Sequence, residues 1–214
     1  YPHAVHGNLF IGDVQSNLVH RLVLKPEGAT FSSVRVDNET EILRSKDNWF
    51  RPTNMVNAPD GTLHIVDIHR EFIETPNSMP EEILAMVDFL SGHEHGRIYR
   101  LAPIGFQAPQ PPKLGSASIG ELVRTLENPN GWWRDTASRL IYERQDSSAI
   151  QLLRALISAS NFDLARLHAL HALEGLNALK VEDILITFND PSPGIREHAA
   201  RLSEPHLNNN EALL

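Results

Sequence analysis

The stretch Trp49-Phe50-Arg51-Pro52 through Pro59-Asp60-Gly61-Thr62-Leu63-His64-Ile65-Val66-Asp67-Ile68-His69-Arg70 predicts a β-hairpin. Pro59-Asp60-Gly61 is typical of a turn, because Pro fixes φ at the first corner, Asp bonds its own backbone and Gly takes a positive φ. Thr62 to Val66 then alternates and is rich in β-branched residues, which favours a strand. Residues 54–58 supply the partner strand before the turn.

Polar side chains gather where the second strand of this hairpin ends. The candidate substrate- or cofactor-binding residues are Arg51, Asp67, His69, Arg70 and Glu74. Arg suits carboxylate recognition, and Asp and Glu accept hydrogen bonds from hydroxyls, so an anionic cofactor or a polyol is one interpretation. The other is a charged loop whose residues only cap and pair with one another. No residue can be assigned as a catalytic base.

Composition narrows the class of protein. The chain has 214 residues, of which 41% are hydrophobic, as expected for one or two globular domains. Its net charge of −8, without a run of Lys and Arg, does not predict nucleic-acid binding. No apolar run approaches the roughly 18 residues of a membrane span. The absence of cysteine excludes disulfides, thiolate metal sites and covalent haem c attachment within this chain.

The first half of the chain has the close strand spacing of antiparallel β architecture. Besides the hairpin, the sequence predicts strands over residues 7–13, 18–24, 30–36 and 96–101, and residues 71–73 could add another. Pro26-Glu27-Gly28 is expected to close the second strand. Pro80 to Leu90 predicts a short helix, because Pro and two acids precede a periodic apolar pattern.

The second half repeats itself after a Pro-rich stretch at Gln107–Gly115. The pattern Arg-x-x-Ala-x-x-apolar starts at Arg134, Arg166 and Arg196, with spacings of 32 and 30 residues. A helix and a turn precede each copy, with the first helices expected over residues 119–126, 149–157 and 181–188. Two helices per unit, with a small Ala at the closest approach, are typical of a helical-repeat solenoid. The three alanines, Ala137, Ala169 and Ala199, are therefore expected to be buried.

Other polar and aromatic motifs have a functional and a structural interpretation. His93-Glu94-His95 could contribute to a metal site, but an exposed loop is favoured because the sequence places no third ligand. His168 and His171 lie three residues apart, a spacing also produced by ordinary helix packing. Trp132-Trp133 is expected to anchor a core, with a carbohydrate-stacking platform as the alternative.

The order of motifs along the chain resembles a family of membrane-bound dehydrogenases, which are similar to soluble quinoprotein sugar dehydrogenases. The motifs are Gly7-Asn8-Leu9-Phe10-Ile11-Gly12-Asp13, Asn17-Leu18-Val19-His20-Arg21, Trp49-Phe50-Arg51-Pro52, Pro59-Asp60-Gly61, Asp67-Ile68-His69-Arg70, Ile73-Glu74, Gly96-Arg97-Ile98-Tyr99-Arg100, Asn128-Pro129-Asn130-Gly131-Trp132-Trp133-Arg134-Asp135-Thr136-Ala137 and Arg166-Leu167-His168-Ala169-Leu170. Two features depart from the family. It usually has an aromatic residue at the position of His69 and His-Pro at the position of Thr75-Pro76.

The resemblance implies an α+β multidomain fold in which a partial, antiparallel β-propeller is followed by an α-helical HEAT-like solenoid. Residues 1–106 would be the last blades, 107–115 a Pro-rich linker and 116–214 the repeats. A blade takes about 40–45 residues and a closed ring needs at least four, so earlier blades are expected in a longer parent protein. The start at Tyr1 favours the same interpretation of the chain as a fragment.

The resemblance also implies a function for that parent: sugar or polyol oxidation coupled to a C-terminal cytochrome c domain. No cofactor is expected within this chain, whereas the parent would hold haem c and a quinone cofactor or calcium. The implied partners are the upstream blades, the cytochrome domain and a carbohydrate or polyol ligand. The implied location is exported or periplasmic, in association with a membrane. A non-catalytic propeller and HEAT-repeat binding or scaffold module is the alternative function.

Overall fold

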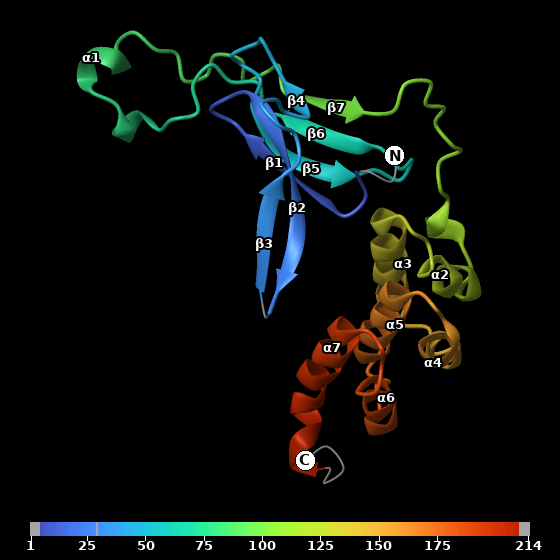
Figure 1. Cartoon of the computed structure of the whole chain (residues 1–214). Coiled ribbons are helices and arrows are strands. Elements are labelled where there is room, and N and C mark those ends of the chain that lie inside the picture. The colour runs from blue at the N-terminus through green and yellow to red at the C-terminus, as the bar shows by residue number, and fades with distance from the viewer. Residues whose placement is uncertain (1–4, 29, 210–214) are drawn as a thin grey trace. The chain divides into compact units, whose positions relative to one another are not determined.

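The computed structural model describes residues 5–28 and 30–209 and divides into two compact units, Tyr1–Pro109 and Gln110–Leu214. The first unit contains the strands and the second contains the longer helices (Figure 1). The predicted mixture of helices and antiparallel sheets is confirmed. The division falls within the Pro-rich stretch that begins at Gln107.

Two antiparallel sheets make up the strand unit. In the first sheet β2 lies between β1 on one side and both β3 and β4 on the other. The second sheet has the order β5–β6–β7. The strands are β1 (Asn8–Asp13), β2 (Leu18–Glu27), β3 (Thr30–Arg35), β4 (Leu43–Arg44), β5 (Pro52–Asn57), β6 (Leu63–Asp67) and β7 (Arg97–Leu101).

The predicted hairpin is confirmed as β5 and β6. Gly61 has φ = 82° and its N–H donates to the carbonyl of Ala58 at 2.9 Å. Asp60 Oδ1 accepts from the backbone N–H of Thr62 at 3.0 Å and from its hydroxyl at 2.6 Å. The turn therefore uses its Asp and Gly in the way that the sequence predicts.

The two sheets approach each other closely at Gly12. A Cβ atom on this residue of β1 would lie 2.1 Å from the carbonyl oxygen of Pro52, at the start of β5. Only glycine allows this contact. Nearby, Val19, Phe50 and Ile65 form a small buried cluster.

Three sequence predictions for the strand unit are wrong. The helix expected over Pro80–Leu90 is the single turn α1 (Glu81–Leu84), because its apolar residues have little to pack on: Met86 is 77% exposed and Leu90 64%. Residues 71–73 form no strand. The second strand does not close at Pro26: β2 continues through this residue, which pairs with Phe31 of β3. β1 pairs with β2 only as far as Val23, so at Pro26 β2 has a neighbouring strand on one side only, where proline is tolerated.

The helical unit consists of three pairs of helices that contact one another in succession. Contacts join α2 to α3, α4 to α5 and α6 to α7, and also α3 to α5 and α5 to α7. Buried apolar side chains from α2 to α5 form one core cluster, against which Trp132 and Trp133 pack. The helices are α2 (Ile119–Thr125), α3 (Gly131–Arg144), α4 (Ala149–Ala159), α5 (Asp163–Gly175), α6 (Val181–Thr187) and α7 (Pro193–Ser203).

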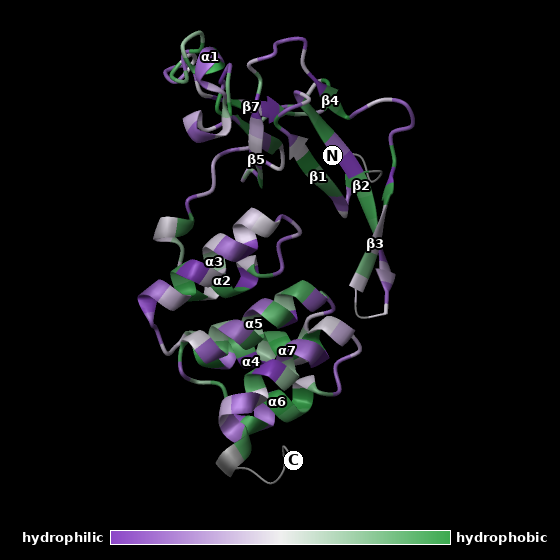
Figure 2. Ribbon diagram, turned by 90° about the vertical axis from the view of Figure 1, so that its left-hand side faces the viewer, coloured by the Kyte–Doolittle hydropathy of each residue, from purple (hydrophilic) through white to green (hydrophobic). Residues whose placement is uncertain are grey.

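The three repeat alanines are buried, as predicted. Ala137, Ala169 and Ala199 each have 0% of their surface exposed. Figure 2 shows hydrophobic and hydrophilic residues mixed along α5 and α7, the helices that carry two of them. Helices can approach closely there because alanine projects only a methyl group.

Replacement of Ala169 by leucine should lower the free energy of unfolding by about 1–3 kcal/mol, because the larger side chain overpacks a closed site. Chemical denaturation followed by helical circular dichroism measures the change. Ala155→Leu, at a position of α4 outside the buried cluster, is the control and should cost much less. Equal stability of both variants would contradict the assigned packing.

Candidate functional site

Asp67 holds together the backbone at the open end of the hairpin, the end opposite the Asp60-Gly61 turn. Its side chain, at the end of β6, is 0% exposed. Oδ1 accepts hydrogen bonds from the backbone N–H of Arg51 and from that of His69, both at 2.8 Å. One carboxylate oxygen thus fixes the entry to β5 and the exit from β6.

The guanidinium of Arg51 is engaged by backbone carbonyls. Nε donates to the carbonyl of Arg70 at 2.9 Å, Nη1 to that of Val14 at 2.8 Å and Nη2 to that of Glu71 at 2.6 Å. The side chain therefore links the end of β1 to the segment after β6. Each guanidinium nitrogen donates one hydrogen bond, so three of the five N–H groups are engaged and Arg51 acts as a structural clamp.

His69 is buried in an uncommon backbone conformation. It is 8% exposed and has φ = 49°, in the left-handed region. Its ring centroid lies 5.5 Å from that of Trp49 and 6.1 Å from that of His95. Its carbonyl oxygen would be 2.3 Å from a Cβ on Gly92, itself at φ = 85°, so this loop also requires glycine.

Two buried polar atoms face each other here without a hydrogen-bond partner among the described residues. They are Oδ2 of Asp67 and Nδ1 of His69, which are 3.8 Å apart. Asp47 Oδ2 lies 3.9 Å from the same nitrogen, and Arg97 Nε lies 3.9 Å from the same oxygen. These distances exceed a direct hydrogen bond, so the two buried atoms stay without a partner among the described residues.

The other two predicted residues contribute less to this arrangement. Arg70 is half-buried, and its Nη1 is 3.3 Å from the carbonyl of Ile68. Glu74 is exposed, and in the described part of the chain no hydrogen bond or ion pair joins it to the other candidates. The structure thus brings together Arg51, Asp67 and His69, and leaves Glu74 outside.

Sequence reasoning missed two side chains at this end of the hairpin, Asp47 and Arg97. A sequence signal for Arg97 does exist, since antiparallel pairing of the last predicted strand with the second strand of the hairpin places this residue opposite Asp67. Asp47 lies in a loop and has no such signal. His93 and His95 lie exposed in the loop before β7, as the favoured interpretation predicts.

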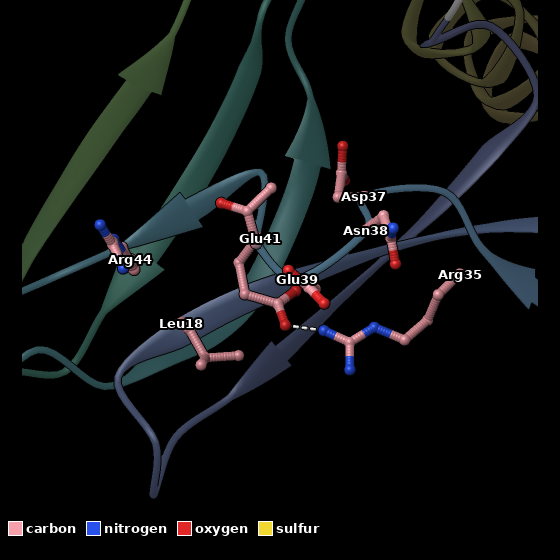
Figure 3. Close-up of a pocket in the computed structure, with 8 residues that line it drawn as sticks. Leu18, Arg35, Asp37, Asn38, Glu39, Glu41 and Arg44 are labelled. Carbon is pink, nitrogen blue, oxygen red and sulfur yellow. Dashed lines mark ion pairs between the residues drawn. The ribbon is translucent and has the colours of Figure 1, made fainter.

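A separate depression of about 510 Å³ lies beside the loop that joins β3 to β4 (Figure 3). Glu41 contacts His20 Nδ1 at 2.9 Å and pairs with Arg35. Asp37 accepts two hydrogen bonds from Arg21, at 2.6 and 3.0 Å. The charges here mostly neutralise one another, so this depression gives no clear preference for a ligand. Its lining comprises Leu18, Arg35, Asp37, Asn38, Glu39, Thr40, Glu41 and Arg44.

In the helical unit, the repeat arginines have the same local role. Each donates to the backbone carbonyl six residues earlier: Arg134 to Asn128 at 2.7 Å, Arg166 to Ser160 at 2.8 Å and Arg196 to Asp190 at 2.7 Å. The acceptor lies in the turn before the helix. We call this contact the arginine clasp.

The second clasp also reaches the third helix pair. Arg166 Nε and Nη2 donate to the two carboxylate oxygens of Asp190 at 2.7 and 2.8 Å. Both side chains are less than 10% exposed. The hydrogen bonds from Arg166 hold the pKa of Asp190 below its ordinary value. Arg154 on α4 pairs with Asp183 on α6 in the same bidentate manner.

Comparison with known protein families gives a match to the first half of the chain. A family model described as a domain of unknown function (DUF7133) matches residues 1–104. No curated protein and no solved structure matches the chain. The matched residues include every strand in the described part of the chain, together with the open end of the hairpin.

Proposed function

We propose that this chain is the central part of a longer protein similar to membrane-bound dehydrogenases. In this proposal residues 1–106 are the last blades of a β-propeller and residues 116–214 are HEAT-like repeats. Support comes from the order of motifs, the two antiparallel sheets and the successive helix pairs. Exposed apolar strand residues such as Phe31 (63%) and Ile98 (67%) also fit sheets that other blades would cover.

Within that protein the role we assign to this chain is binding or scaffolding, without catalysis of its own. The observation that carries this is the engagement of Arg51 by three backbone carbonyls. A guanidinium used in this way positions the hairpin, and most of its N–H groups are already committed to the backbone. The helix pairs would present a surface to another domain, as solenoids do.

A second candidate function is oxidoreductase activity of the sugar-dehydrogenase type in the parent. The buried, unpartnered atoms on Asp67 and His69 favour it, because buried polar groups left without a hydrogen bond in native proteins are often found at catalytic sites. The strained backbone of His69 is also of the kind found at functional sites. In this case the parent, exported or periplasmic, would carry haem c and a quinone cofactor or calcium. No helix in the described residues is long and apolar enough to cross a bilayer.

Calorimetric titration of a quinone cofactor and of glucose, into this chain and into the parent, separates the two functions. We expect this chain alone to bind neither. If its role is scaffolding, His69→Asn leaves the affinity of the parent unchanged; asparagine is chosen because it tolerates a positive φ. If the parent is an oxidoreductase that uses this end of the hairpin, the same change weakens binding about tenfold, or by 1.4 kcal/mol.

The exposed His93, whose ring nitrogen lies 2.7 Å from the carbonyl of Leu90, is the matched control; changed to asparagine, it should have no effect in either case. Binding by this chain alone, weakened by His69→Asn, would contradict the scaffolding role. The reading frame that encodes the chain gives a further test. Absence of upstream blades would contradict the propeller assignment, and a downstream Cys-x-x-Cys-His motif would favour the oxidoreductase.

A further inference from the structure

Two histidines from different helices meet in the helical unit. Nε2 of His171, on α5, lies 2.9 Å from Nδ1 of His198, on α7. The ring centroids are 4.9 Å apart and the planes cross at 82°. Both side chains are half-buried. At this distance one ring donates an N–H to the lone pair of the other, and the tautomers decide which ring is the donor.

We propose that this histidine pair makes the packing of α7 on α5 sensitive to protons. With both rings neutral, or with one protonated, a hydrogen bond joins the two nitrogens. With both protonated, two N–H donors and two positive charges face each other, and the contact opens. The proposal does not depend on the function of the chain.

The groups around the pair oppose its protonation more than they favour it. The pKa of His171 is lowered, first by burial of its ring and then by His198. Arg201 on α7 and His168 on α5 act in the same direction, whereas Glu174 opposes them. On α3, Asp135, Arg139 and Tyr142 line the groove beside His168 and His171. Burial also lowers the pKa of His168, against the attraction of Asp135.

The direction of the pH effect follows from the lowered pKa. An unfolded chain binds the proton at His171 near the ordinary value of about 6.5, whereas the folded chain binds it only at lower pH. The contribution of the neutral pair to stability is therefore complete above about pH 6.5. Below that pH it decreases, because the unfolded chain takes up protons that the folded pair resists, and the contact opens when both rings are protonated.

Hydrogen exchange on the full chain tests the proposal, with rates corrected for the intrinsic effect of pH. Between about pH 8 and about pH 5, protection of residues 193–203 should fall about tenfold relative to residues 119–144. Replacing both His171 and His198 by glutamine, which keeps hydrogen-bonding groups but does not titrate, should abolish this difference. His168→Gln, on the same helix, is the control and should preserve it.

Three results would overturn the proposal. One is equal loss of protection with and without the two histidines. Another is a fall in protection of α7 on adding EDTA at about pH 8, which would assign the paired nitrogens to a bound metal. The third applies if the double variant does not fold, in which case nuclear magnetic resonance follows the titration of the two rings in the unmodified chain. The proposal requires that the two titrations are coupled; independent titrations near the ordinary pKa would refute the proposal.

Discussion

Replacement of Arg166 by alanine should lower the free energy of unfolding of the helical unit by about 3–5 kcal/mol, because it leaves the buried carboxylate of Asp190 without its cationic partner. Asp190 loses both hydrogen bonds from Arg166, in a site where both partners are less than 10% exposed, and keeps that from the backbone N–H of Ser192. The carbonyl of Ser160 loses its donor as well. Denaturation followed by helical circular dichroism measures the change.

Two further variants decide whether the buried charge causes this loss. Arg196→Ala removes a clasp of the same form on an exposed side chain, and should cost only about 0.5–1.5 kcal/mol. Arg166→Met combined with Asp190→Leu removes both charges and should recover most of the loss. If Arg166→Ala costs no more than Arg196→Ala, the ion pair does not stabilise the contact between the helix pairs.

Replacement of Asp67 by alanine should lower the stability of the strand unit by about 2–6 kcal/mol. Two backbone N–H groups, those of Arg51 and His69, lose their acceptor in a closed site, and each such loss costs about 1–3 kcal/mol. Asp67→Asn keeps an acceptor oxygen in place and should retain much of the stability.

Fluorescence of Trp49 can follow this transition if Trp132 and Trp133 of the helical unit are first replaced by phenylalanine. The same denaturant series on Asp67→Ala and Asp67→Asn gives the comparison. Equal loss in both variants would mean that the charge of Asp67, and not its role as an acceptor, stabilises the hairpin.

The sequence predicts the local features well because their causes lie within a few residues. The hairpin follows from a turn in which Asp60 and Gly61 have defined backbone roles. The burial of Ala137, Ala169 and Ala199 follows from a repeated spacing. The prediction of a helix over Pro80–Leu90 is wrong because a longer helix needs tertiary packing as well as a local pattern. The apolar residues Met86 and Leu90 remain largely exposed.

The candidate site was only partly predictable. Arg51, Asp67 and His69 come together because one hairpin carries them all. That Arg51 serves as a clamp depends on three carbonyls, of Val14, Arg70 and Glu71, which converge only once both sheets have formed. Residue types do not record where backbone oxygens point, so sequence reasoning left both a ligand-binding and a structural role open for this arginine.

The arginine clasp has a consequence for how such a chain can change in length. In each repeat the arginine and its acceptor are six residues apart and belong to the same unit. A gene duplication or deletion of one whole unit would therefore copy or remove a clasp complete with its acceptor. The bond between Arg166 and Asp190 is different, because it joins two units. Recombination at that boundary must therefore restore an acid in the next turn.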